Sequence, residues 1–186
     1  VLGQQHVVDA REGPALALDL SGSALGLSAM LGYLVLSLWL AASGLMLLFK
    51  GQSWPRWLVH HRRDLGVAAF VYAALHTLVY VIDRGSLDRI IEALPHTEIW
   101  TGWAAMLVFI PLAITSNNAS QRWLRTGWKA LQRMAYPAAV LVLIHWAALH
   151  NWGSWPPAAV HFGPLLALWA YRLWYWYLRP ARSAVT

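Results

Sequence analysis

Five long apolar stretches dominate this sequence and limit what the chain can fold into. A helix that crosses a membrane needs about 20 mostly apolar residues, because its backbone polar groups must all be satisfied internally. The stretches are continuous and do not alternate between apolar and polar residues, which favours helices over strands. We therefore expect one all-α domain over residues 1–186, an integral-membrane bundle. Its five spanning helices should cover about 24–49, 65–82, 99–116, 130–150 and 157–178.

The composition supports a membrane protein. Of the 186 residues, 59% are hydrophobic and 12% are charged, whereas soluble domains carry about 25% charged residues. The absence of cysteine excludes disulfides, iron–sulfur clusters and thiolate ligands. The net charge of +6 comes from basic residues at the ends of the apolar runs, a pattern of membrane topology. The expected surroundings are a lipid bilayer, and no nucleic acid partner is indicated.

The basic residues also predict an orientation. Eleven of the 14 Lys and Arg residues lie in three regions, which are 50–64, 117–133 and the C-terminal end. In a five-helix bundle these regions share one side, which the positive-inside rule assigns to the cytoplasm. The 83–98 loop then faces outward, where it could form a short surface helix.

Two histidines lie inside apolar stretches, where an ionisable ring is costly without a partner or a role. His76 and His145 lie close to the outer ends of the second and fourth predicted helices, at depths within about 5 Å of each other. Imidazole is a good iron ligand, and two imidazoles would fill both axial positions of a haem. The pair therefore predicts haem-based electron transfer, with His76 and His145 as metal ligands. The alternative is that each histidine only forms a hydrogen bond with a neighbouring helix.

The remaining histidines are weaker candidates. His60 and His61 lie in the basic inner loop, where an interfacial pair without a cofactor is the simpler interpretation. The functional alternative is that one of them binds a second, inner haem whose propionates pair with Arg62 or Arg63. His150 follows His145 by five residues and should face elsewhere, so it is only a substitute ligand. The predicted spans contain no buried carboxylates, which argues against a proton-coupled transporter.

Four short motifs, in order, resemble the ferric reductase-like transmembrane family. The resemblance covers about residues 55–150 and is closest to the haem-binding membrane subunits of periplasmic methionine sulfoxide reductase systems. The motifs are Arg-Arg-Asp-Leu-Gly at 62–66, Leu75-His76 followed by Tyr80, Pro-Leu-Ala-Ile-Thr-Ser at 111–116, and Trp-Lys-Ala-Leu-Gln-Arg-Met-Ala-Tyr at 128–136.

The resemblance implies a function and a location. His76 and His145 fall on the family's haem histidines, so b-type haem is implied. Members lie in the bacterial inner membrane and pass electrons from quinol or flavin to a periplasmic or membrane partner. They usually have six helices, so a sixth helix upstream of residue 1 is expected.

One position departs from the family pattern. Gln132 stands where the family has a histidine, 13 residues before His145 and about 20 Å deeper along a helix. Glutamine is a poor iron ligand, so the inner haem is lost, or His60 or His61 replaces the ligand, or another cofactor such as quinone or FMN lies there. The first hypothesis is an electron-transfer subunit with one haem b. The alternative is a structural or assembly subunit of a larger membrane complex that keeps the fold.

Overall fold

The structure, a computed structural model, describes residues 12–150, 152 and 155–178. This part of the chain is helical and contains no strand. The helices are α1 (Glu12–Leu48), α2 (Ser53–His60), α3 (Arg62–Arg84), α4 (Leu87–Ala93), α5 (Thr97–Ile114), α6 (Asn118–Leu124), α7 (Thr126–Arg133), α8 (Ala135–Leu149) and α9 (Trp155–Leu173), and a π-helical turn, η1 (Trp174–Leu178), follows α9.

Three helices of the described chain are long and apolar enough to cross a membrane. They are Gly22–Leu48 within α1, all of α3 and all of α5. Helix α8 has 15 residues and rises only about 22 Å, less than the thickness of a bilayer core. The all-helical prediction is confirmed for the described residues, whereas the prediction of five spans stays a prediction.

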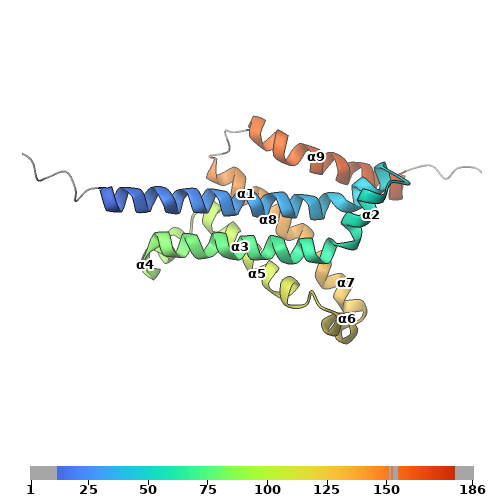
Figure 1. Ribbon diagram of the computed structural model, residues 1–186, viewed down its shortest axis with the longest axis horizontal. Coiled ribbons are helices and arrows are strands. Elements are labelled where there is room, and N and C mark those ends of the chain that lie inside the picture. The colour runs from blue at the N-terminus through green and yellow to red at the C-terminus, as the bar shows by residue number, and fades with distance from the viewer. Residues whose placement is uncertain (1–11, 151, 153–154, 179–186) are drawn as a thin grey trace, which may run out of the picture.

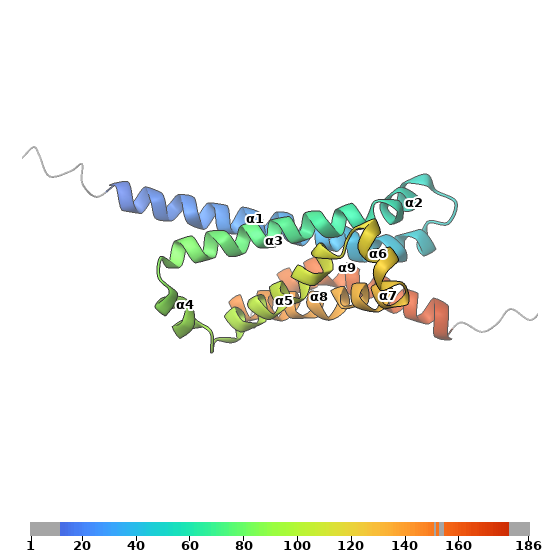
Figure 2. The ribbon, with the colours of Figure 1, turned by 90° about the horizontal axis from the view of Figure 1, so that it is seen from below.

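The helices form two facing layers. Helix α1 packs along α3, and α5 packs along α8, with fewer contacts between α3 and α5. Figure 2 shows α1 and α3 in one layer and α5 and α8 in the other, and Figure 1 shows α9 beside α1. Between the layers lies one buried apolar cluster, formed by Leu36, Trp39, Leu40, Ala69, Ala105, Phe109, Leu112, Ala135 and Ala138.

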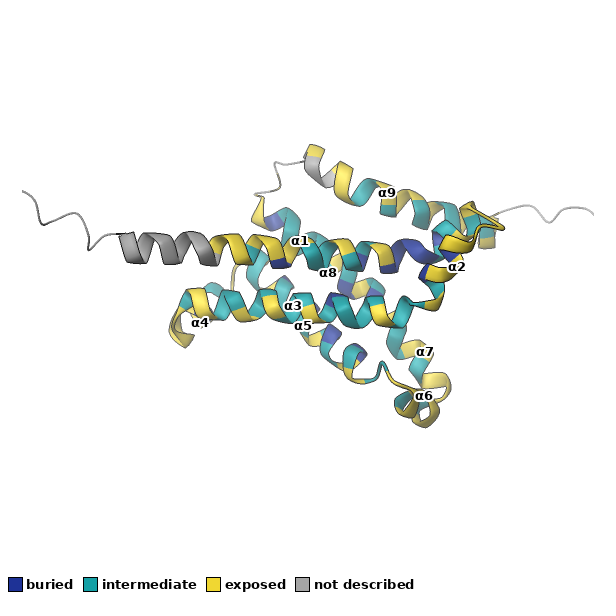
Figure 3. Cartoon of the chain, in the orientation of Figure 1, coloured by how far each residue is buried: buried dark blue, intermediate teal, exposed yellow. Residues whose placement is uncertain are grey.

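The outer faces of the helices are apolar and exposed. Figure 3 shows exposed positions along the outside of α1 and α3. Leu78 and Ile82 of α3 and Leu107 of α5 are each more than half exposed. Large contiguous apolar surface of this kind marks contact with a membrane or another protein. Contact with lipid explains this exposure, because the three residues lie on helices that are long enough to span a membrane.

The two ends of the bundle differ in charge. Helices α2, α6 and α7 lie at one end, and α4 lies at the other (Figures 1 and 2). The basic regions 50–64 and 117–133 therefore share one end, as the predicted topology requires. Helix α4 is the short surface helix expected within 83–98, and Gly85 before it ends α3 with φ 68°, a left-handed conformation that favours glycine.

The positions of α4 and α6 can be tested by cysteine labelling. The chain has no cysteine of its own, so a maleimide would react with this protein only at an introduced cysteine. In spheroplasts, a membrane-impermeant maleimide should label Glu92→Cys in α4, and should label Arg122→Cys in α6 only after the membrane is permeabilised. Both positions are exposed at opposite ends of the bundle. The reverse pattern, with Arg122→Cys labelled in intact spheroplasts and Glu92→Cys labelled only after permeabilisation, would show that the predicted orientation is wrong.

The fourth predicted helix differs from the expectation. Instead of one helix over 130–150, the chain forms α7 and α8, which meet at Met134. Pro137 lies in the first turn of α8. Proline is tolerated there because the first N–H groups of a helix have no partner within the helix.

Candidate haem-binding site

His76 on α3 and His145 on α8 lie together between the two layers. Their ring centres are 6.3 Å apart and their planes are inclined by 83°. A metal–imidazole bond is about 2 Å long and the ring centre lies about 1 Å beyond the nitrogen, so two imidazoles on opposite sides of one metal have centres about 6 Å apart. The observed separation agrees with this value. The two rings, 69 residues apart in the sequence, are thus within reach of a single metal.

Each imidazole is held by a backbone carbonyl of a neighbouring helix. His76 Nδ1 donates a hydrogen bond to the Leu25 carbonyl oxygen of α1, at 3.1 Å. His145 Nδ1 donates to the Glu98 carbonyl oxygen in the first turn of α5. A carbonyl oxygen only accepts, so in both rings Nδ1 carries the hydrogen and Nε2 keeps a free lone pair. Ligand histidines in metal sites are oriented by contacts of this kind.

Gly102 provides the space that the His145 ring occupies. A Cβ atom at this position would lie 2.9 Å from His145 Nδ1 and 3.0 Å from Cε1, closer than real Cβ contacts allow. The preceding residue, Thr101, is fully buried and donates to the Thr97 carbonyl oxygen at 2.6 Å. Sequence reasoning did not identify Gly102, and the available signal was a glycine inside an otherwise apolar helix.

A cavity of about 200 Å³ lies beside the two rings. All four helices of the two layers contribute to its wall, which is mostly apolar and rich in small residues. These include Ala29, Gly32, Ala73, Gly102 and Ala105. Two neighbouring imidazoles whose Nδ1 atoms are engaged elsewhere, beside an apolar wall between helices, are features that a haem with two histidine ligands requires. The residues present therefore fit this group.

The other predicted site residues lie away from this pair. His61 stacks on Trp57, with ring centres 4.3 Å apart, and its Nδ1 donates to the Trp57 carbonyl oxygen at 3.1 Å. Arg63 donates to Asn118 Oδ1 at 2.6 Å and to Gln121 Oε1 at 3.0 Å, and so joins α3 to α6. The roles of His61 and Arg63 toward an inner haem stay predictions.

Gln132 is engaged in a structural contact. Its Nε2 donates to the Leu112 carbonyl oxygen at 3.2 Å and lies 3.3 Å from Thr115 Oγ1. Both acceptors belong to the C-terminal end of α5, where the last carbonyl groups lack partners within the helix. Gln132 thus joins α7 to the end of α5. Gln132 also lines a pocket at the end of the bundle where α2, α6 and α7 lie (Figures 1 and 2), and His61 is not among the residues of that pocket.

The comparison with known families gives a clear result. Residues 26–143 match the family described as ferric reductase like transmembrane component. The chain belongs to the ferric reductase-like transmembrane family. The matched segment contains His76 and ends two residues before His145.

Curated relatives indicate which group of proteins this chain resembles. The proteins of Brucella ovis, Brucella canis and Brucella suis named protein-methionine-sulfoxide reductase heme-binding subunit MsrQ are each 36% identical to this chain over 132 residues. The alignment covers 69% of this chain and 59% of each relative, so the chain spans less than two thirds of their length. No solved structure matches. The resemblance identified from the four motifs is confirmed.

Proposed function

We propose that this protein is an electron-transfer subunit of the bacterial inner membrane that binds one b-type haem through His76 and His145. The proposal depends on one observation, which is the 6.3 Å separation of the two ring centres with both Nδ1 atoms engaged by carbonyl groups. When bound, haem supplies one-electron oxidation and reduction at its iron. With His76 and His145 both holding the group, no place at the iron would remain for a substrate, so electron transfer would be its role.

The protein residues have defined tasks in this function. The Leu25 and Glu98 carbonyl groups fix the direction of the two imidazoles and hold their hydrogens at Nδ1. The apolar wall of the cavity excludes water and thereby influences the potential of the bound group. Because α3 and α8 both run from the basic end toward the opposite end, the two ligands lie in the half of the bundle near α4.

We further propose that the electrons come from quinol or a reduced flavin and leave to a periplasmic partner. The position of the two histidines in the outer half, on the predicted orientation, supports an acceptor on that side. The names of the Brucella relatives suggest a protein-methionine-sulfoxide reductase as this partner. We also propose that five helices span the membrane, and that α8 and α9 are the fourth and fifth of them.

Absorption spectroscopy followed by turnover tests this function. The purified protein should show the narrow bands of low-spin b-type haem after dithionite reduction. A quinol analogue, or FMN with a flavin reductase, should then reduce the haem, and a soluble periplasmic acceptor should reoxidise it. A colourless preparation would contradict the haem assignment.

A structural or assembly subunit is the second candidate, and the contacts of Gln132 favour it. With its amide bound to the end of α5, Gln132 supplies no ligand for an inner haem that would carry electrons across the membrane. This candidate predicts a haem that dithionite reduces but that exchanges no electrons with quinol, flavin or any periplasmic acceptor. The turnover measurement therefore separates the two candidates.

A further inference from the structure

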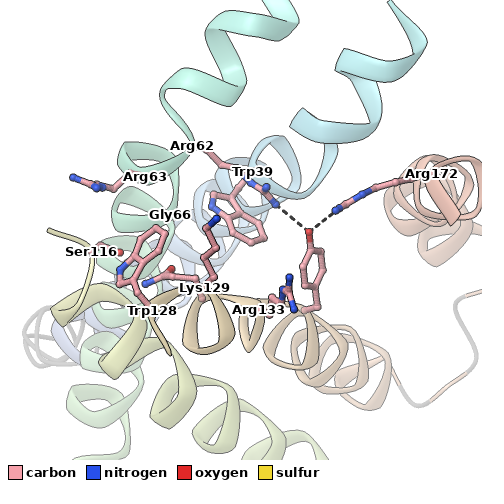
Figure 4. Close-up of a pocket in the computed structure, with 11 residues that line it drawn as sticks. Trp39, Arg62, Arg63, Gly66, Ser116, Trp128, Lys129, Arg133 and Arg172 are labelled. Carbon is pink, nitrogen blue, oxygen red and sulfur yellow. Dashed lines mark hydrogen bonds between the residues drawn. The ribbon is translucent and has the colours of Figure 1, made fainter. Parts of the chain in front are cut away.

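The basic end of the bundle contains a second pocket, of about 400 Å³. It lies among α1, α3, α7, α8 and α9, and Figure 4 shows the side chains around it. Its wall includes five cationic side chains, and no Asp or Glu belongs to the wall in the part of the chain that the structure describes. The cations are Arg62, Arg63, Lys129, Arg133 and Arg172.

Two of these cations share one neutral acceptor. Arg62 Nη2 and Arg172 Nη1 both donate to the Tyr136 hydroxyl, at 3.2 Å and 2.8 Å, and Figure 4 marks both hydrogen bonds. The Arg62 guanidinium also lies over the Trp39 ring, 4.1 Å from its centre. The Tyr136 hydroxyl accepts the two hydrogen bonds and the Trp39 ring attracts the Arg62 guanidinium. Neither group is a carboxylate that would neutralise the positive charge of the arginines. The pocket therefore keeps a positive charge that its described wall does not compensate.

Several donors of the pocket have no acceptor among the residues that the structure describes. Arg62 Nε is enclosed and forms no hydrogen bond. Lys129 and Arg133 are exposed and form no hydrogen bond or ion pair with any other described residue. Convergent cationic donors without acceptors suit an anion with several oxygen atoms, and Arg and Lys are the residues that bind phosphate groups.

The position of the pocket indicates which phosphate compound it takes. Arg62 is the first residue of α3, a helix long and apolar enough to span a membrane, so the pocket lies where the apolar span begins. Trp128, which is only partly buried, belongs to its wall, and its Nε1 donates to the Thr115 carbonyl oxygen at 2.9 Å. Tryptophan rings mark the headgroup level of a bilayer, and basic pockets between membrane helices on the cytoplasmic side bind anionic lipid headgroups.

We propose that this pocket binds the phosphate group of an anionic phospholipid, with Lys129 and Arg133 as its contacts at the exposed rim. The acyl chains would then lie along the apolar outer surface of the bundle. The inference goes beyond electron transfer, and it does not depend on the group held by His76 and His145.

Native mass spectrometry of the purified full chain tests the proposal. The protein in a neutral detergent is mixed with equal amounts of phosphatidylglycerol and phosphatidylcholine that have the same acyl chains. We expect about tenfold higher retention of phosphatidylglycerol, and we expect the double variant Lys129→Gln/Arg133→Gln to lose this preference. The matched control Arg122→Gln/Arg125→Gln removes the same charge from exposed positions outside the pocket and should keep it.

Two further measurements make the result decisive. The conservative variant Lys129→Arg/Arg133→Lys keeps both charges and should retain phosphatidylglycerol, which separates loss of charge from loss of folding. Inorganic phosphate at millimolar concentration should not displace the lipid. The proposal is overturned by equal retention of the two lipids, by equal loss in the pocket variant and its control, or by displacement with inorganic phosphate, which would identify a soluble phosphate compound as the ligand.

Discussion

His76→Ala and His145→Ala should each remove the low-spin haem spectrum from the purified protein. Each substitution deletes one of two imidazoles whose ring centres lie 6.3 Å apart, and alanine offers no ligand atom. A single remaining histidine holds the iron on one side only, so bound haem per chain should fall at least about tenfold. The measurement is haem stoichiometry from a pyridine haemochrome assay, together with the dithionite-reduced spectrum.

The matched control is His96→Ala. His96 is exposed and precedes α5, where its Nδ1 lies 3.1 Å from the Ala93 carbonyl oxygen. Its loss removes an imidazole that belongs to neither α3 nor α8 and leaves the pair in place, so haem content should stay unchanged. Retention of the full spectrum in both His76→Ala and His145→Ala would show that the ligands are other residues.

Gly102→Ala should weaken haem binding, although it adds only a single methyl group. We expect the second largest effect on haem retention from this variant. The added Cβ would lie 2.9 Å from His145 Nδ1, so the ring must move and its hydrogen bond to the Glu98 carbonyl oxygen must weaken. Changes of the groups that orient a metal ligand cost about 10- to 100-fold in metal affinity. We therefore expect about tenfold weaker haem retention in a competition assay with apomyoglobin.

Gly163→Ala provides the comparison, because nothing lies within 4 Å of a Cβ at that position of α9. Alanine favours a helix interior over glycine by about 1 kcal/mol, so the substitution by itself should not weaken α5 or α9. A haem loss confined to Gly102→Ala thus reports contact with the His145 ring. Identical haem retention in the two glycine variants would exclude Gly102 from the support of this ligand.

Much of the candidate site could be predicted from the sequence, because membrane burial of a polar ring is a strong local signal. The depths of His76 and His145 followed from helix rise alone, and the structure brings their rings together. The carbonyl groups of Leu25 and Glu98 could not be predicted, because every residue has a carbonyl and only packing selects which one meets an imidazole. The break at Met134 was also missed, since the apolar pattern continues from α7 into α8.

At the basic end of the bundle, too, some features could be predicted from the sequence and others depend on tertiary packing. The substitution at Gln132 was visible against the family motif, but its bonds to Leu112 and Thr115 depend on how α7 meets the end of α5. The sequence showed that basic residues gather at one side of the membrane, because their clustering beside apolar runs is a property of the chain order. Only the tertiary structure placed five of these cations around one pocket without a carboxylate in its described wall.

The sequence alone determined that this chain is a helical membrane protein with two imidazoles at similar depth, because hydrophobic length and helix rise act along the chain. The tertiary structure decided which helices face one another, which carbonyl groups orient the rings, and where a glycine leaves space for His145. These features depend on contacts between residues far apart in the sequence, whose positions are set by the packing of two layers and not by local preference.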